Sequence, residues 1–100
     1  MSKAQEQLSG FNQTEIREPS MFKVLLINDN YTTFDFVVEV LCTFFYKTTT
    51  EAKNITLTIH KEGKGIAGIY SRDMAETKMQ QVNGYARKNG HPLLCEVEPV

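Results

Sequence analysis

The chain has 100 residues, which is enough for one domain around a single core. Hydrophobic residues make up 41% of it and charged residues 23%, a composition typical of a globular protein rather than a disordered one. The formal net charge is -1 at pH 7, so the chain lacks the excess of Lys and Arg on which general nucleic-acid binding depends.

The first 20 residues are rich in Gln, Ser, Glu and Asn and show no sustained periodicity. We therefore expect a flexible tail over residues 1–20, closed by Pro19, and a folded domain over residues 21–100. Residues 22–27 (FKVLLI) form a short apolar run with β-branched members, which predicts a buried strand. This strand should end at the polar residues 28–30.

A helix is predicted next, over about residues 34–45. Thr32 or Thr33 can cap it, and Asp35 lies in its first turn, where a negative charge is favourable. Its apolar residues cover about twice the arc that a surface helix needs to contact a core. Two explanations remain open: the helix is buried on two sides, or one edge of the arc lines a pocket.

Residues 48–65 carry two conflicting patterns. Thr48 and Glu51 form a capping box and Gly63 is a typical stop, which together favour a helix over about residues 49–61. The alternation of Ile55, Leu57 and Ile59 with threonines is instead typical of a strand, and with residues 62–70 the segment would form a hairpin.

The remainder of the chain predicts a strand over residues 66–70, a helix and a last strand over residues 93–97. Ser71 or Asp73 can cap the helix, and Asn89-Gly90 ends it. Its predicted core face recurs at helical spacing in Ala75, Met79, Val82 and Ala86. One sheet covered by helices, an α+β sandwich, is the expected fold.

Catalytic signatures are absent: the sequence contains no HExxH, GxSxG, GxxxxGK[ST] or CxxC motif. His91 and Cys95 stand four residues apart, but a zinc site would need two further ligands. The polar stretch 28–32 has two interpretations. It is an ordinary turn, or its carboxylate and amide oxygens bind a cation beside the apolar helix.

Cys42 and Cys95 lie in apolar surroundings without close pairing, so we expect free thiols in a reducing compartment. No apolar run approaches the length of a membrane span, and the N-terminus lacks the apolar segment of a signal peptide. We therefore expect a cytoplasmic protein.

Three segments, FKVLLINDNYTTFDFVVEVL, IHKEGKGIAGIYSRDMAETK and VNGYARKNGHPLLCEVEP, resemble the ClpS family of bacterial adaptors of the ClpAP protease. The resemblance covers about residues 19–98, and the motifs NDxYT, HxxGK, AETK and HPLLC occur in the family's order and spacing. It implies a three-stranded antiparallel sheet packed with three helices in the order β-α-α-β-α-β, with residues 49–61 helical.

The resemblance also implies a monomeric, non-enzymatic protein without a cofactor. Such a protein binds others that begin with Leu, Phe, Tyr or Trp and delivers them to the ClpA unfoldase by docking on its N-terminal domain. The positions matching those that hold the substrate α-amino group are Asn28, Asp29 and His60. Those around the hydrophobic pocket are Thr32, Phe34, Val37, Val38, Leu41, Thr56, Ile59 and Leu93. Those that dock on ClpA are Asp73, Glu76 and Lys78.

Four positions depart from the usual pattern of the family. Phe34 stands in place of a methionine at the pocket mouth, Thr33 in place of a proline, Asn30 in place of an aspartate, and Thr56 in place of a large apolar residue. The accepted N-terminal residues therefore remain open. A similar sandwich occurs in the C-terminal domain of the ribosomal stalk protein, a structural module in which the amine-binding trio would have no role.

Overall fold

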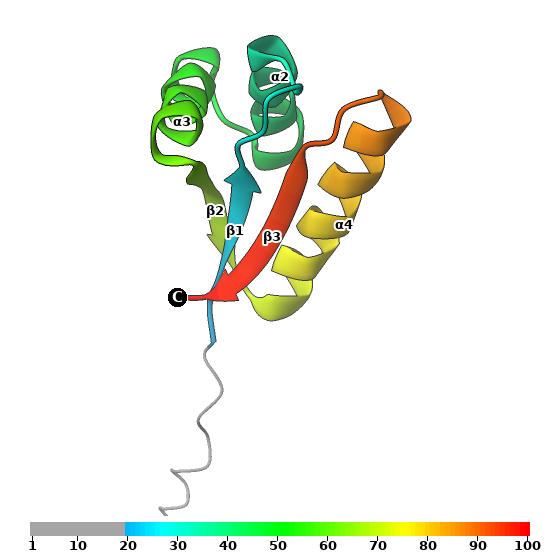
Figure 1. The fold of residues 1–100 in the computed structure, drawn as a ribbon. Coiled ribbons are helices and arrows are strands. Elements are labelled where there is room, and N and C mark those ends of the chain that lie inside the picture. The colour runs from blue at the N-terminus through cyan, green and yellow to red at the C-terminus, as the bar shows by residue number, and fades with distance from the viewer. Residues whose placement is uncertain (1–19) are drawn as a thin grey trace, which may run out of the picture.

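Three strands and three helices make up the fold of residues 20–100, the part of the chain that this computed structural model describes (Figure 1). They are β1 (Phe22–Ile27), α2 (Phe34–Phe45), α3 (Thr49–Glu62), β2 (Lys64–Tyr70), α4 (Arg72–Lys88) and β3 (Leu94–Pro99). The sheet has the order β2-β1-β3, and β1 is antiparallel to both neighbours. The predicted α+β fold and its element order are confirmed, whereas the tail predicted over residues 1–20 lies, except for Ser20, outside the described residues.

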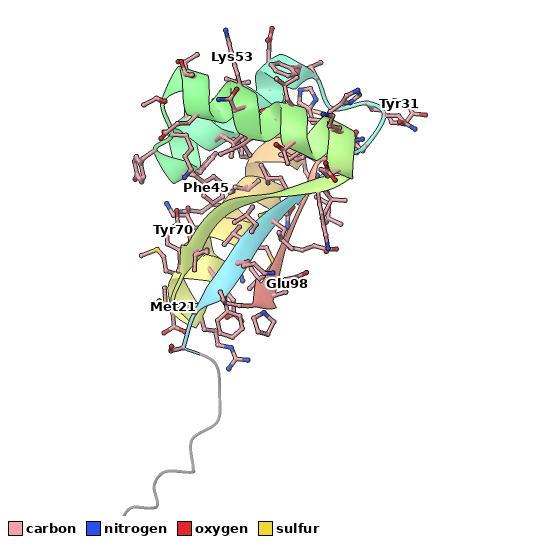
Figure 2. All side chains as sticks on the ribbon, turned by 90° about the vertical axis from the view of Figure 1, so that its left-hand side faces the viewer. Met21, Tyr31, Phe45, Lys53, Tyr70 and Glu98 are labelled. Carbon is pink, nitrogen blue, oxygen red and sulfur yellow. The ribbon has the colours of Figure 1, made fainter. Side chains whose placement is uncertain are left out.

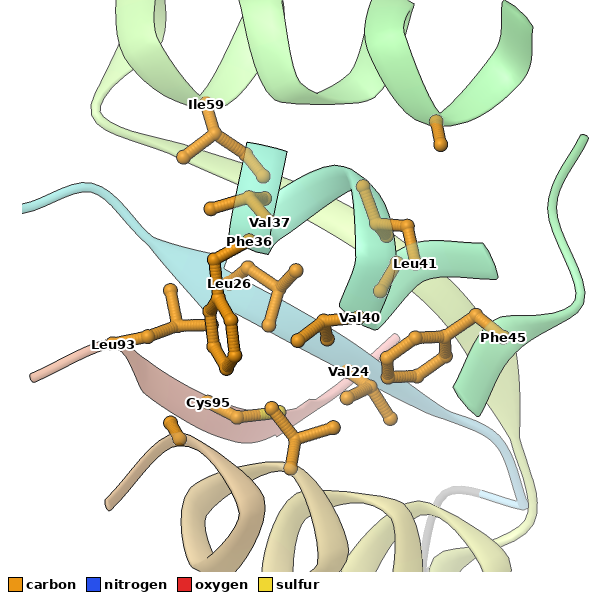
Figure 3. Close-up of a cluster of buried hydrophobic side chains, with 14 of the residues drawn as sticks. Val24, Leu26, Phe36, Val37, Val40, Leu41, Phe45, Ile59, Leu93 and Cys95 are labelled. Atoms are coloured by element: carbon orange, nitrogen blue, oxygen red, sulfur yellow. The ribbon is translucent and has the colours of Figure 1, made fainter. Parts of the chain in front are cut away.

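The core lies between the sheet and the helices. In Figure 2 the sheet stands in front of α4, and α2 and α3 lie together above one end of the strands. Val24 and Leu26 of the central strand β1 are completely buried. Figure 3 shows them directed toward Val40 and Phe45 of α2, with Cys95 of β3 beside them. Burial raises the pKa of the Cys95 thiol to about 12, so this cysteine acts as an apolar core residue.

Helix α2 begins where the sequence predicted. The Thr33 hydroxyl is its cap and accepts a hydrogen bond from the Phe36 N–H at 3.1 Å. The helix packs against both α3 and α4, which explains its wide apolar arc. At its first turn, however, Phe34 and Val37 line a surface cavity. The two explanations of the arc therefore apply to different parts of one helix.

Helix α3 settles the conflict over residues 48–65 in favour of the capping box. The Thr48 hydroxyl accepts from the Glu51 N–H at 3.1 Å, and the Glu51 carboxylate accepts from the Thr48 N–H at 2.9 Å. Gly63 ends the helix with a φ of 94°, a conformation that favours glycine. Its buried residues recur at helical spacing, in Ala52, Thr56 and Ile59. The alternation that suggested a hairpin is therefore incidental.

Helix α4 corrects the predicted core face at one position. Ala75, Val82 and Ala86 are buried as expected, but Met79 is only partly buried and Lys78 is buried in its place. Ser71 occupies the cap position, although its side chain makes no capping hydrogen bond. Within residues 20–100, no helix is long and apolar enough to cross a membrane.

Candidate functional site

The loop between β1 and α2 is shaped by the carboxylate of Asp29. Its Oδ1 accepts hydrogen bonds from the Tyr31 N–H at 2.8 Å and the Thr32 N–H at 2.7 Å, and its Oδ2 accepts from the Thr32 hydroxyl at 2.7 Å. The Asn28 N–H donates to the Gly63 carbonyl at 2.9 Å. This bond fixes the loop to the end of α3, and Figure 2 shows Tyr31 at its tip beside that end.

Asp29 carries a full negative charge at neutral pH. Partial burial, the largest single effect, raises the pKa of its carboxyl group. The hydrogen bonds from Thr32 and Tyr31, together with the charge interaction with His91, outweigh burial and lower the pKa below its ordinary value. A carboxylate has about four lone-pair positions, and three are already used within the loop. Asp29 therefore offers a ligand its charge and about one further hydrogen bond.

A surface cavity of about 370 Å³, here called the first cavity, opens between this loop, the first turn of α2 and the second half of α3. Its polar end is formed by the loop and by His60, and its apolar wall by side chains of the two helices. The lining residues are Asn28, Asp29, Asn30, Thr32, Phe34, Val37, Thr56, Leu57, Ile59 and His60. A much smaller cavity of about 20 Å³ shares five of these residues and adds Ile27 and Leu93.

The structure thus brings together most of the residues expected around the α-amino group and the pocket. The exceptions are Val38 and Leu41, which line neither cavity. Leu41 is completely buried in the core, and Val38 packs against that core. A helix rises about 1.5 Å per residue, so Leu41 lies about 10 Å along α2 from Phe34 and the cavity mouth. Only the first turn of α2 reaches the cavity.

Thr56, one of the departures from the family pattern, is 4% exposed, and its hydroxyl donates to the Ala52 carbonyl at 2.7 Å. Because the hydroxyl of Thr56 is hydrogen-bonded within the helix, Thr56 can line the cavity without leaving a buried polar group unpaired. Phe34, the departure at the mouth, is 41% exposed and lines the cavity.

Two lining residues, Asn30 and Leu57, were not among the predicted site residues. Asn30 lies in the same polar loop as Asp29, and this position is the sequence signal that could have identified it as a lining residue. Leu57 is an apolar residue on a largely polar face of α3 and is 56% exposed. Such an isolated leucine is common on protein surfaces, so the sequence pattern alone does not single it out.

The three residues expected to dock a partner are not equally accessible. Asp73 and Glu76 are exposed at the start of α4, where Glu76 lies 3.8 Å from the Nε of Arg72. Lys78 is only 9% exposed, and its ammonium donates a hydrogen bond to the Phe44 carbonyl at 2.6 Å. The same ammonium lies over three aromatic rings, those of Phe45, Tyr46 and Tyr70. Lys78 therefore joins α4 to the end of α2.

The first cavity suits a cation attached to an apolar group. It offers a fixed negative charge and amide and imidazole acceptors at one end, and an apolar wall at the other. Within residues 20–100, no group of three or more His, Cys, Asp or Glu side chains could hold a metal ion. The geometry supports recognition of a ligand that joins a cation to an apolar group.

Comparisons with known proteins point to one family. The family model described as "ATP-dependent Clp protease adaptor protein ClpS" matches residues 17–96. Two proteins named ATP-dependent Clp protease adapter protein ClpS are similar to the chain. That of Shewanella halifaxensis is 53% identical over 93 residues, which is 93% of this chain and 91% of the relative. That of Shewanella loihica is 56% identical over 86 residues, or 86% and 84%.

A solved structure, Agrobacterium tumefaciens ClpS2 bound to L-phenylalaninamide, superposes with a TM-score of 0.79 at 32% sequence identity. The match covers 83% of this chain and 100% of the Agrobacterium chain.

Proposed function

The chain belongs to the ClpS family of ATP-dependent Clp protease adaptors, which are not catalytic, and we propose that it binds proteins by a free N-terminal residue with a large apolar side chain. It then delivers them to the ClpA unfoldase for degradation by ClpAP. The observation that carries this proposal is the first cavity, in which a negative polar end adjoins an apolar wall.

The polar end of the first cavity suits a protein's α-amino group. This amine has a pKa of about 7.7–8 and is mostly protonated at pH 7, whereas an internal peptide nitrogen carries no charge. Asp29 supplies the opposite charge, Asn28 a carbonyl oxygen, and His60 a ring nitrogen that can accept a hydrogen bond. Because Asp29 already accepts three hydrogen bonds within the loop, we assign it one direct hydrogen bond to the amine and the remaining ones to the other two residues.

The apolar wall of the cavity then selects the first side chain. Burying a Leu or Phe side chain contributes about 1.5–3 kcal/mol, and each hydrogen bond to a charged group contributes about 1.5–3 kcal/mol. After the cost of association, these contributions correspond to a dissociation constant of about micromolar order, weak enough for transfer to an unfoldase. The ligand of the Agrobacterium structure, L-phenylalaninamide, combines a free amine with an aromatic side chain and supports the proposal.

The direct test is a fluorescence-anisotropy titration with peptides that differ only in their first residue. Leu, Phe, Tyr and Trp should bind, whereas Ile, Val and Gly should bind weakly. The Phe34 ring at the cavity mouth should favour an aromatic first residue over Leu by about 0.5–1.5 kcal/mol, the size of an aromatic pair. Equal affinity for all seven peptides would refute the proposed function.

The same panel tests the role of Phe34. Phe34→Met should flatten the ranking because methionine is flexible, and Phe34→Ala should admit Ile and Val by widening the mouth. Tyr31→Ala is the matched control, since Tyr31 is an aromatic residue of the loop just before α2, 80% exposed, that does not line the cavity. If all four proteins give one ranking, Phe34 does not contact the ligand.

Docking on the N-terminal domain of ClpA is a separate part of the proposal, and we assign it to the exposed start of α4. Asp73 and Glu76 are exposed, and we assign the partner contacts to them, whereas Lys78 supports this surface by fixing the end of α2. We assign peptide binding to residues 21–100, which hold the lining residues that the structure describes, and expect this domain to be a monomer. The tail over residues 1–20 is assigned to delivery.

Reversing a charge on α4 should separate delivery from binding. Glu76→Lys is expected to slow degradation of a reporter beginning with Phe by ClpAP severalfold while leaving peptide affinity unchanged. Glu96→Lys makes the same charge change on an exposed residue of β3 and should leave both unchanged. Equal degradation rates for the two variants would remove Glu76 from the docking surface.

A further inference from the structure

Leu57 separates two cavities on the surface of α3. Beyond it lies a second cavity of about 520 Å³, lined by Leu57, Thr58, His60 and Lys61. The first cavity also includes Leu57 and His60, so the two cavities adjoin along these side chains. Successive side chains of an extended peptide point to opposite sides of the backbone. A peptide whose amine lies beside His60 can therefore place its first side chain in one cavity and its second in the other.

The two cavities differ in charge. The first contains the carboxylate of Asp29, whereas the second contains the ammonium of Lys61 and no carboxylate among its lining residues. Lys53 and Lys61 lie one turn before and one turn after Leu57 on the same helix face, and both are exposed. The nearest acidic residue in sequence, Glu62, lines a different cavity, with Lys64 and Glu98. A peptide with an ammonium group on its first residue and a carboxylate on its second would match this charge distribution.

We propose that the second cavity is a subsite for the second residue of a bound N-terminus, and that Lys61 makes an acidic side chain the favoured one there. The inference rests on the proposed function, since it requires the N-terminus to lie in the first cavity. The subsite would select among proteins that share a first residue but differ in the second.

The test compares three amidated peptides that begin with Phe and carry Glu, Gln or Lys at position 2, each measured by anisotropy against wild type, Lys61→Gln and Lys61→Glu. Wild type should bind the Glu peptide about two- to fivefold more tightly than the Lys peptide, as expected for an exposed ion pair. Lys61→Gln should remove this preference and Lys61→Glu should reverse it. In about 1 M salt, where the screening length is about 3 Å, the wild-type preference should disappear.

Two controls isolate the second residue. Lys88→Glu makes the same charge change at another exposed lysine in the last turn of a helix, outside both cavities, and should keep the wild-type ratio. L-phenylalaninamide has no second residue, so its affinity should be nearly the same for wild type and Lys61→Gln. An unchanged Glu-to-Lys ratio in Lys61→Glu would overturn the inference while leaving the proposed function intact. If wild type shows no preference for Phe over Gly in the panel of peptides that differ in their first residue, the proposed function is refuted instead.

Discussion

Acetylation of the N-terminus of a peptide that begins with Phe is expected to weaken its binding by about a hundredfold or more. Acetylation removes the charge of the amine and two of its donors, while the Phe side chain stays unchanged. Two hydrogen bonds to a charged group contribute about 3–6 kcal/mol together, and each 1.4 kcal/mol corresponds to a factor of ten. The charge of Asp29 would also be left without a counter-charge in the partly enclosed cavity.

The measurement is a competition titration in which free and acetylated peptides displace a labelled peptide beginning with Phe. A peptide acetylated only on an internal lysine is the control, because it loses the same type of charge at a different place. That peptide should compete as well as the unmodified one. Comparable competition by the N-terminally acetylated peptide would show that the first side chain alone is recognised.

Asp29→Asn is expected to weaken peptide binding by about tenfold or more, with a smaller loss of thermal stability than Asp29→Ala. The amide keeps an oxygen that can accept the hydrogen bonds of the Tyr31 and Thr32 N–H groups, so the loop conformation survives. What is lost is the negative charge opposite the amine, which amounts to about 1.5–3 kcal/mol for a charge-assisted contact. Asp29→Ala removes all three loop hydrogen bonds as well, so it should reduce both affinity and stability.

The comparison of the two variants, by anisotropy and by thermal unfolding, separates charge from loop structure. If Asp29→Asn binds as tightly as wild type while Asp29→Ala does not, Asp29 acts only by shaping the loop.

Lowering the pH cannot replace the Asn variant, because protonation of Asp29 also destabilises the folded state. Because folding lowers the pKa of Asp29, its carboxylate stabilises the folded state at neutral pH, and this contribution is lost only as the pH falls through the lowered value.

Local sequence patterns predicted most of the secondary structure and the position of the polar loop, whereas the choice between helix and hairpin over residues 48–65 came from the family resemblance. The Thr48–Glu51 capping box and the stop at Gly63 are interactions within one turn, and the structure forms both as the sequence predicted. The polar stretch after β1 was a candidate site because a charged group and amides follow a buried strand beside an apolar helix, but an ordinary turn fitted the pattern equally, and the family resemblance made the choice. These features depend on neighbours within a few residues, which is why the sequence alone reveals them.

Tertiary structure alone decided which side chains reach the cavity and which reach solvent. Leu41 has the spacing of a pocket residue but lies in the core, because the cavity touches only the first turn of α2. Lys78 lies on the core side of α4, because the end of α2 supplies a carbonyl and aromatic rings for its ammonium. Leu57 borders two cavities only because the loop of residues 28–33 packs beside α3. In each case the neighbour lies on another element, and periodicity along one helix carries no information about it.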